Sequence, residues 1–116
     1  MEDDRRSPYS AALPSQLRRG VLEFCVLALL RDDERYAVEL VQELAGKDGL
    51  VTSEGTLYPL LSRLRREGVV ETTWRESPGG PPRRYYALTL AGRSVLDVFT
   101  AEWARFRDTV DGIIAP

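Results

Sequence analysis

The sequence contains no histidine and a single cysteine, Cys25, among its 116 residues. The absence of histidine removes the Ser-His-Asp and Cys-His nucleophile systems, the commonest general base and the commonest metal ligand. A single cysteine excludes an internal disulfide and a zinc site built from several cysteines. We therefore predict a protein that is not an enzyme and has no cofactor and no bound metal. Cys25 is expected to be a small buried apolar residue rather than a redox sensor.

Long hydrophobic runs are also missing. The longest strongly apolar run, Phe24 to Leu30, is far shorter than the roughly 20 residues that a membrane span needs. The first seven residues carry three acids and two arginines, which is unlike a signal peptide. With 43% hydrophobic and 29% charged residues, the composition is that of a globular domain. These features predict one cytoplasmic domain with no membrane contact.

Lysine is almost absent, because 15 of the 16 basic residues are arginine and only Lys47 is lysine. A GC-rich genome explains this bias without any functional interpretation. The net charge of −2 is uneven, however: residues 53–88 hold six arginines against four acids. Binding to a polyanion depends on a local patch of charge, so the overall acidity does not exclude a nucleic-acid partner.

Apolar periodicity predicts helices at about 17–30, 36–45, 54–67 and 90–114. The first is apolar nearly all round and must be covered on more than one side. Gly46 and Gly49 bracket a turn, Thr52 or Ser53 offers an N-cap, and Gly68 ends the third helix. Pro59 inside that helix predicts either a kink or a first turn that is not fully α-helical.

Two β-like runs, Val69–Arg75 and Arg83–Leu88, follow the third helix and are separated by a Pro/Gly-rich tip, Glu76–Pro82. Thr89 then caps the last helix. The order helix, helix, helix, hairpin, helix predicts a mainly α fold with a small β-hairpin, a winged helix-turn-helix with one appended helix. The expected parts are a flexible arm (1–14), the DNA-binding domain (15–88) and a C-terminal dimerisation helix (89–116).

The third helix and the hairpin form the first candidate site. Helix-turn-helix modules insert the start of their second helix into the major groove, while a wing contacts the backbone or the minor groove. Hydroxyls and guanidinium groups suit such contacts, although the same arginines could simply solvate a helix face and a loop. The predicted DNA-binding residues are Ser53, Thr56, Tyr58, Pro59, Ser62, Arg63, Arg66, Arg83 and Arg84.

The last helix carries the second candidate site, an apolar seam with alternating spacings of four and three. This period of 3.5 residues is typical of helices that pack lengthwise. About 26 residues rising 1.5 Å each give roughly 39 Å, so the helix must project beyond its own domain. The alternative is that the seam packs on the chain's own first helix. The seam starts at Gly92, and the predicted dimer-interface residues are Leu96, Phe99, Trp103, Phe106, Val110 and Ile113.

Three segments together resemble PadR-type transcriptional regulators over residues 17 to about 114. Gly55–Leu61, followed by Arg63-Leu64 and Glu67–Val70, is similar to the family's signature. Arg83–Gly92 is similar to its wing strand and the cap of its last helix, and Arg19–Leu30 to its first helix.

The resemblance implies a two-fold homodimer of the compact subtype, a repressor that binds an inverted-repeat operator in double-stranded DNA and is released by a small-molecule effector. It also implies that Trp103, flanked by Phe99 and Phe106, could bind a planar aromatic molecule. The alternative for Trp103 is an interface anchor. The alternative function is a winged-helix protein-interaction module, which predicts an acidic or neutral third helix and a wing without arginine.

Overall fold

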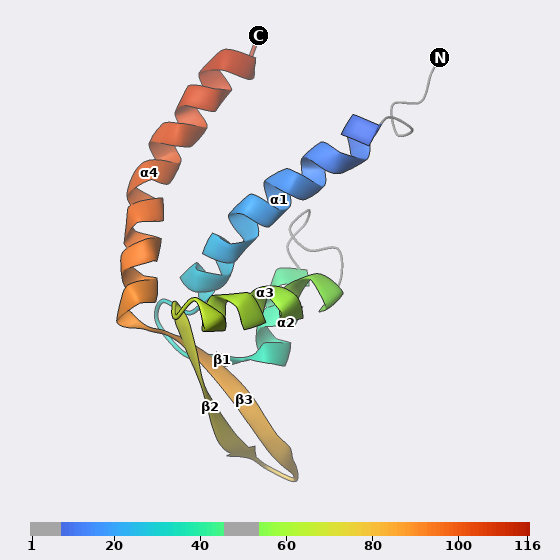
Figure 1. Cartoon of the computed structure of the whole chain (residues 1–116), viewed down its shortest axis with the longest axis vertical. Coiled ribbons are helices and arrows are strands. Elements are labelled where there is room, and N and C mark those ends of the chain that lie inside the picture. The colour runs from blue at the N-terminus through green and yellow to red at the C-terminus, as the bar shows by residue number, and fades with distance from the viewer. Residues whose placement is uncertain (1–7, 46–53) are drawn as a thin grey trace.

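The computed structural model describes residues 8–45 and 54–116, which form four α-helices and a three-stranded antiparallel sheet (Figure 1). This arrangement confirms the predicted winged helix-turn-helix with one appended helix. The predicted turn at Gly46 to Gly49, the N-cap at Thr52 or Ser53 and the first seven residues of the arm lie outside the described residues. The elements are α1 (Pro8–Leu29), β1 (Arg35–Tyr36), α2 (Ala37–Ala45), α3 (Glu54–Arg66), β2 (Val70–Ser77), β3 (Gly80–Leu88) and α4 (Leu90–Ile114).

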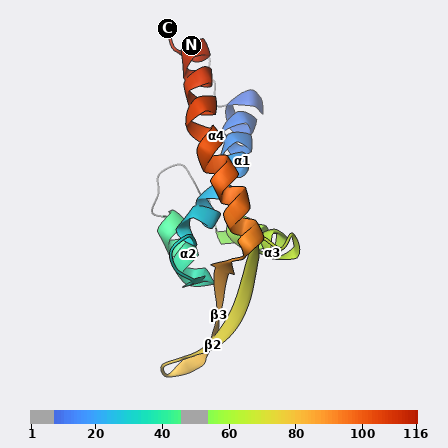
Figure 2. The same cartoon turned by 90° about the vertical axis from the view of Figure 1, so that its left-hand side faces the viewer.

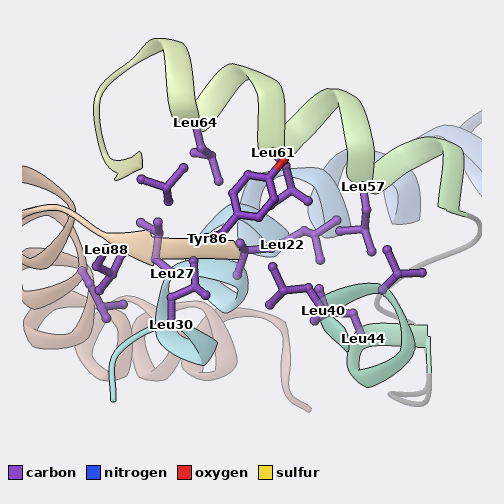
Figure 3. Packing of buried hydrophobic residues seen from close by; sticks show 14 residues of the cluster. Leu22, Leu27, Leu30, Leu40, Leu44, Leu57, Leu61, Leu64, Tyr86 and Leu88 are labelled. Carbon is purple, nitrogen blue, oxygen red and sulfur yellow. The ribbon is translucent and has the colours of Figure 1, made fainter. Parts of the chain in front are cut away.

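The hydrophobic core lies where α1, α2, α3 and the sheet meet (Figure 3). The predicted i, i+4, i+7 set of α3, Leu57, Leu61 and Leu64, is fully buried. Each fully buried leucine contributes about 1.5–3 kcal/mol relative to an exposed one. The other buried side chains are Leu22, Val26, Leu27, Leu30, Leu40, Val41, Leu44, Val70, Tyr86, Leu88 and Leu96.

Helix α1 begins at Pro8, nine residues before its predicted start at Leu17, so residues 8–14 are helical and not part of a flexible arm. The prolines suggested irregular chain at this end. Pro8 is at the first helical position, where proline is favoured because its missing N–H would have no intrahelical partner there and its φ already suits the helix. Pro14 lies inside the helix, and this reason does not apply to it.

The start of α2 is set by Tyr36, which belongs to β1 and not to the helix as predicted. Its backbone N–H donates to Glu39 Oε1 at 3.0 Å, one half of a capping box. β1 was not predicted, because two residues are too short to show an alternating pattern. It pairs with β3, which places Tyr36 opposite Tyr85 in a sheet of order β1-β3-β2.

The hairpin strands are longer than predicted, and Pro78 and Gly79 alone connect them instead of the loose tip Glu76–Pro82. Gly79 has φ +69°, which suits the second central position of a type II turn. Arg75 pairs with Arg83 and Ser77 with Gly80, so Glu76 lies opposite two prolines. This bulge leaves residues unpaired and thereby accommodates prolines that cannot donate to the ladder.

Pro59 lies inside α3, which is α-helical from Glu54, so a first turn that is not α-helical was the wrong alternative. Gly68 ends the helix with φ +78°. The N–H of Val69 donates to Leu64 O at 3.2 Å and that of Gly68 to Arg65 O at 3.0 Å, as in a Schellman motif.

The start of α4 is joined to the end of α3. Thr89 caps α4 as predicted, accepting from the Gly92 N–H at 3.0 Å, and its hydroxyl donates to Gly68 O at 2.6 Å. Gly92 passes so close to the residue before β2 that a Cβ there would lie 2.0 Å from Val69 O. The N-terminal end of α1 and the C-terminal end of α4 extend away from the hairpin, which projects at the opposite end (Figures 1 and 2).

Gly92→Ala should destabilise the protein by about 1–3 kcal/mol, because the new methyl group overlaps a backbone carbonyl that cannot move without shifting β2. Gly112→Ala is the matched control in the same helix, since nothing lies within 4 Å of its Cβ. It should stabilise the helix by up to about 1 kcal/mol. Chemical denaturation measures both changes. Equal stability of the two variants would contradict the close approach at Gly92.

Candidate nucleic-acid interface

The outer face of α3 carries most of the predicted DNA contacts. Thr56, Tyr58, Pro59, Ser62 and Arg66 are exposed, and Tyr58 keeps 41% of its surface accessible. Ser53 lies outside the described residues. The buried leucines on the opposite side hold this face outward, so hydroxyl and guanidinium groups are displayed on a rigid helix.

The predicted residues of α3 do not all point the same way. Steps of three and four residues keep side chains on one side of a helix. Thr56, Pro59, Arg63 and Arg66 accordingly border a groove between α3 and α1. Tyr58 and Ser62 follow the same spacing on the other flank. The predicted contact residues of α3 therefore occupy two flanks of the helix and not a single stripe.

Arg63 is half-buried and already bound within the protein. Its Nη2 donates to Glu23 Oε1 of α1 at 2.5 Å, and its Nη1 donates to Glu67 Oε2 at 2.9 Å. These hydrogen bonds, first the one to Glu23, raise the pKa of the Arg63 guanidinium further above its ordinary value. Arg63 thus ties α3 to α1, and a DNA contact by its guanidinium requires one of these ion pairs to open.

The two predicted wing arginines lie on opposite faces of the hairpin, because successive side chains of β3 alternate. Arg84 shares the face of the buried Tyr86, and its guanidinium carbon lies 4.9 Å from the centre of the Trp74 ring. Arg84 Nε is buried and has no hydrogen-bond partner among the described residues, so the indole face supplies a stabilising contact. Arg83 lies on the other face, 4.6 Å from the Tyr36 ring centre.

Arg75 adds a third guanidinium to the wing, on the same face as Arg83. It lies 5.2 Å from the Tyr85 ring centre and forms an ion pair with Glu34, just before β1. The wing is thereby fastened to β1 at its base. Because side chains alternate along a strand, the sequence could have predicted that Trp74 and Arg75 lie on opposite faces of β2. No pattern in the sequence indicated that Glu34 and Tyr36 contact the wing arginines.

The α4 seam divides into two halves. In the first half, Gly92 and Leu96 are buried, and Phe99 stacks on Phe24 of α1 with ring centres 4.0 Å apart. The alternative that the seam packs on the chain's own first helix thus holds for this half. In the second half, Val110 is partly covered, whereas Phe106 is 61% and Ile113 77% exposed in the single chain.

Trp103 lies between these halves and lines an apolar groove of about 440 Å³ between α1 and α4. Its ring centre is 5.5 Å from that of Phe99 and 6.1 Å from that of Phe106. The three predicted effector-binding side chains are therefore contiguous. The first helix supplies the facing wall, made by Leu17, Gly20 and Val21.

Burial raises the pKa of the Cys25 thiol, which is partly buried against the core of α1. A raised pKa lowers the thiolate fraction at neutral pH and with it the reactivity of the sulfur. This environment is that of the predicted apolar packing residue. Within the described parts of the chain, no helix is both long and apolar enough to cross a lipid bilayer.

The geometry agrees with comparisons to known proteins. The model of the transcriptional regulator PadR-like family matches residues 26–98. The transcriptional regulator Rv3488 of Mycobacterium tuberculosis is 36% identical over 81 residues, which span 70% of this chain and 74% of that protein.

Solved structures extend the similarity to the whole fold. A PadR-like transcriptional regulator from Bacillus cereus is 36% identical, with a TM-score of 0.77 over 87% of this chain and 98% of that one. A PadR family regulator from Eggerthella lenta is 35% identical, with a TM-score of 0.76 over 91% of this chain and 92% of that one. Taken with the helix-turn-helix, the arginine-bearing wing and the long last helix, these matches show that the chain belongs to the PadR-like family of DNA-binding transcriptional regulators.

Proposed function

We propose that this regulator is a cytoplasmic homodimeric repressor that binds an inverted-repeat operator and is released by a planar aromatic effector. The observation that carries the proposal is the exposed hydroxyl- and arginine-bearing face of α3, with three guanidinium groups on the adjoining wing. The alternative, a protein-interaction module, predicts an acidic or neutral third helix and a wing without arginine, and the sequence has neither.

The DNA contacts divide between α3 and the wing. Thr56, Tyr58, Ser62 and Arg66 are exposed on a rigid helix, as direct contacts in a major groove require. The wing arginines lie over aromatic rings, which limits their conformational freedom and suits phosphate contacts of fixed geometry. We therefore assign sequence selection to α3 and general affinity to the wing.

The second half of the α4 seam supports the homodimer. A helix of 25 residues with exposed Phe106 and Ile113 leaves a lengthwise apolar surface in water. A period of 3.5 residues is the pattern by which two such helices cover each other. Two-fold pairing of α4 would place two DNA-binding domains at a set separation, which is the geometry an inverted repeat matches.

The groove at Trp103 supports the effector. Its volume of about 440 Å³ and its aromatic lining suit a flat apolar molecule. Both walls belong to helices that also connect to the DNA-binding domain, α1 through the core and α4 through Thr89. A ligand that changes the spacing of α1 and α4 would therefore change the positions of the two recognition helices.

Replacing both Arg83 and Arg84 by glutamine should weaken binding to operator and random duplexes alike, because a wing mainly meets phosphates. The slope of log affinity against log salt concentration should fall by about 0.9 for each phosphate that the variant no longer neutralises. Fluorescence anisotropy at several salt concentrations measures this slope. Arg105→Gln is the control, since Arg105 is a 71% exposed arginine of α4 bound to Glu102. Identical affinities for wild type and double variant would contradict the binding of phosphates by the wing.

The operator should be an inverted repeat with half-site centres about 10 bp apart, because a two-fold dimer presents two recognition helices about one helical turn apart. Selection from a random DNA pool followed by footprinting gives the arrangement. Protection of one asymmetric half-site at saturation would contradict the symmetric dimer.

Trp103→Ala should abolish the response to a planar aromatic dye while leaving a dimer, because the other seam residues remain. The chain has two tryptophans, so Trp74→Phe makes Trp103 the sole indole reporter. Dye binding should quench the fluorescence of Trp74→Phe, and should lower operator affinity of the wild type about five- to 150-fold. A monomeric Trp103→Ala would identify an interface anchor instead, and no quenching by any planar dye would refute the aromatic effector.

A further inference from the structure

A second groove lies between α1 and α3. It encloses about 360 Å³. Arg19 and Leu22 of α1 form one wall, and Thr56, Pro59, Arg63 and Arg66 of α3 form most of the other. The groove therefore combines an apolar floor with three guanidinium groups and one hydroxyl.

Among the residues that the structure describes, no carboxylate lines this groove, but two lie just behind Arg63. Glu23 and Glu67 hold its guanidinium through hydrogen bonds of 2.5 and 2.9 Å. Glu23 follows Arg19 by four residues, so both project from the same side of α1 towards α3. The two carboxylates offset the positive charge of Arg63 and hold its side chain in place.

Arg19 and Arg66 remain as the cations of the groove. Both are exposed, and neither forms an ion pair with a carboxylate of the described residues. Two such guanidinium groups, from two different helices, can donate to the oxygens of one phosphate, whose geometry matches the planar fork of arginine. The chemistry of the groove thus favours a phosphate group.

The position of the groove identifies the source of that phosphate. Its rim residues Thr56, Pro59 and Arg66 also belong to the exposed face of α3 that the proposed function presents to DNA. A duplex seated on that face brings its sugar–phosphate backbone along the edge of α3, next to α1. A backbone phosphate is therefore the anion that reaches Arg19 without any further movement of the chain.

We infer that Arg19 of α1 and Arg66 of α3 together bind one backbone phosphate of the duplex, with Arg63 serving as a positioning residue held by Glu23. This inference rests on the proposed DNA binding, and it extends the DNA-contacting surface from the helix-turn-helix onto α1. Glu23 holds α3 against α1 and so sets the distance between the two phosphate-binding side chains.

Arg19→Gln should weaken binding to a selected operator and to a random duplex by the same factor. It should lower the salt slope by less than about 0.9, because Arg66 still neutralises the shared phosphate. Arg19→Lys keeps the charge and should retain the salt slope while reducing the affinity in part. Arg105→Gln on α4 is the matched control and should bind like the wild type. Arg19 is exposed, so thermal unfolding of the variants should match that of the wild type.

Arg66→Gln tests whether the two arginines share one phosphate. The salt slope of the double variant Arg19→Gln/Arg66→Gln should then fall by about 0.9 in total, whereas two separate phosphates would give about 1.8. A fall of about 1.8, or an altered sequence preference in Arg19→Gln, would overturn the shared phosphate. Wild-type affinity in Arg19→Gln would overturn the inference while leaving DNA binding intact. Failure of the wild type to bind any duplex would instead overturn the proposed function.

Discussion

Burial of α1 on two sides is the constraint on which the other elements depend. Leu22 and Val26 are buried in the core, whereas Phe24 stacks on Phe99 of α4. A helix with apolar residues on nearly all sides is stable only when both sides are covered. The DNA-binding domain and the last helix thus share one structural support, and neither is complete without α1.

The N-terminal end of α4 supplies the second connection between the DNA-contacting part of the molecule and the last helix. Thr89 bonds both to Gly68 and to the first turn of α4, while Gly92 lies against Val69 O. Since Gly68 and Val69 lie between α3 and β2, the direction of α4 is set by the end of α3. Arg19 and Val21, in the same turn of α1, line two different grooves, one beside α3 and one beside Trp103. The surface proposed for DNA and the surface proposed for the effector are therefore separated by the width of a single helix.

The wing shows how a hairpin can carry positive charge with a fixed geometry. Each of its arginines lies over an aromatic ring, and Arg75 is also bound to Glu34. Cation–π contacts of this kind contribute about 0.5–1 kcal/mol at exposed sites, less than an ideal buried ion pair but without neutralising the charge. Arg63 shows the opposite arrangement, because two carboxylates hold it firmly and offset its charge. Arginine thus keeps its charge over aromatic rings in the wing, whereas Arg63 on the flank of α3 ties two helices together through ion pairs.

Local pattern in the sequence was enough to determine the order of the four helices and the hairpin, the buried leucines of α3, the Thr89 cap and the 3.5-residue seam of α4, since each depends on spacing within one segment. Strand β1 was missed because two residues show no pattern. The start of α1 was misjudged because a proline is compatible with both a loop and a first helical turn. Tertiary structure alone decided that Arg63 is bound to Glu23, 40 residues away, and that the guanidinium of Arg83 lies over the ring of Tyr36. It also divided the seam into a half covered by α1 and a half left exposed. These features depend on contacts between distant segments, whose distances follow from packing and not from any periodicity along the chain.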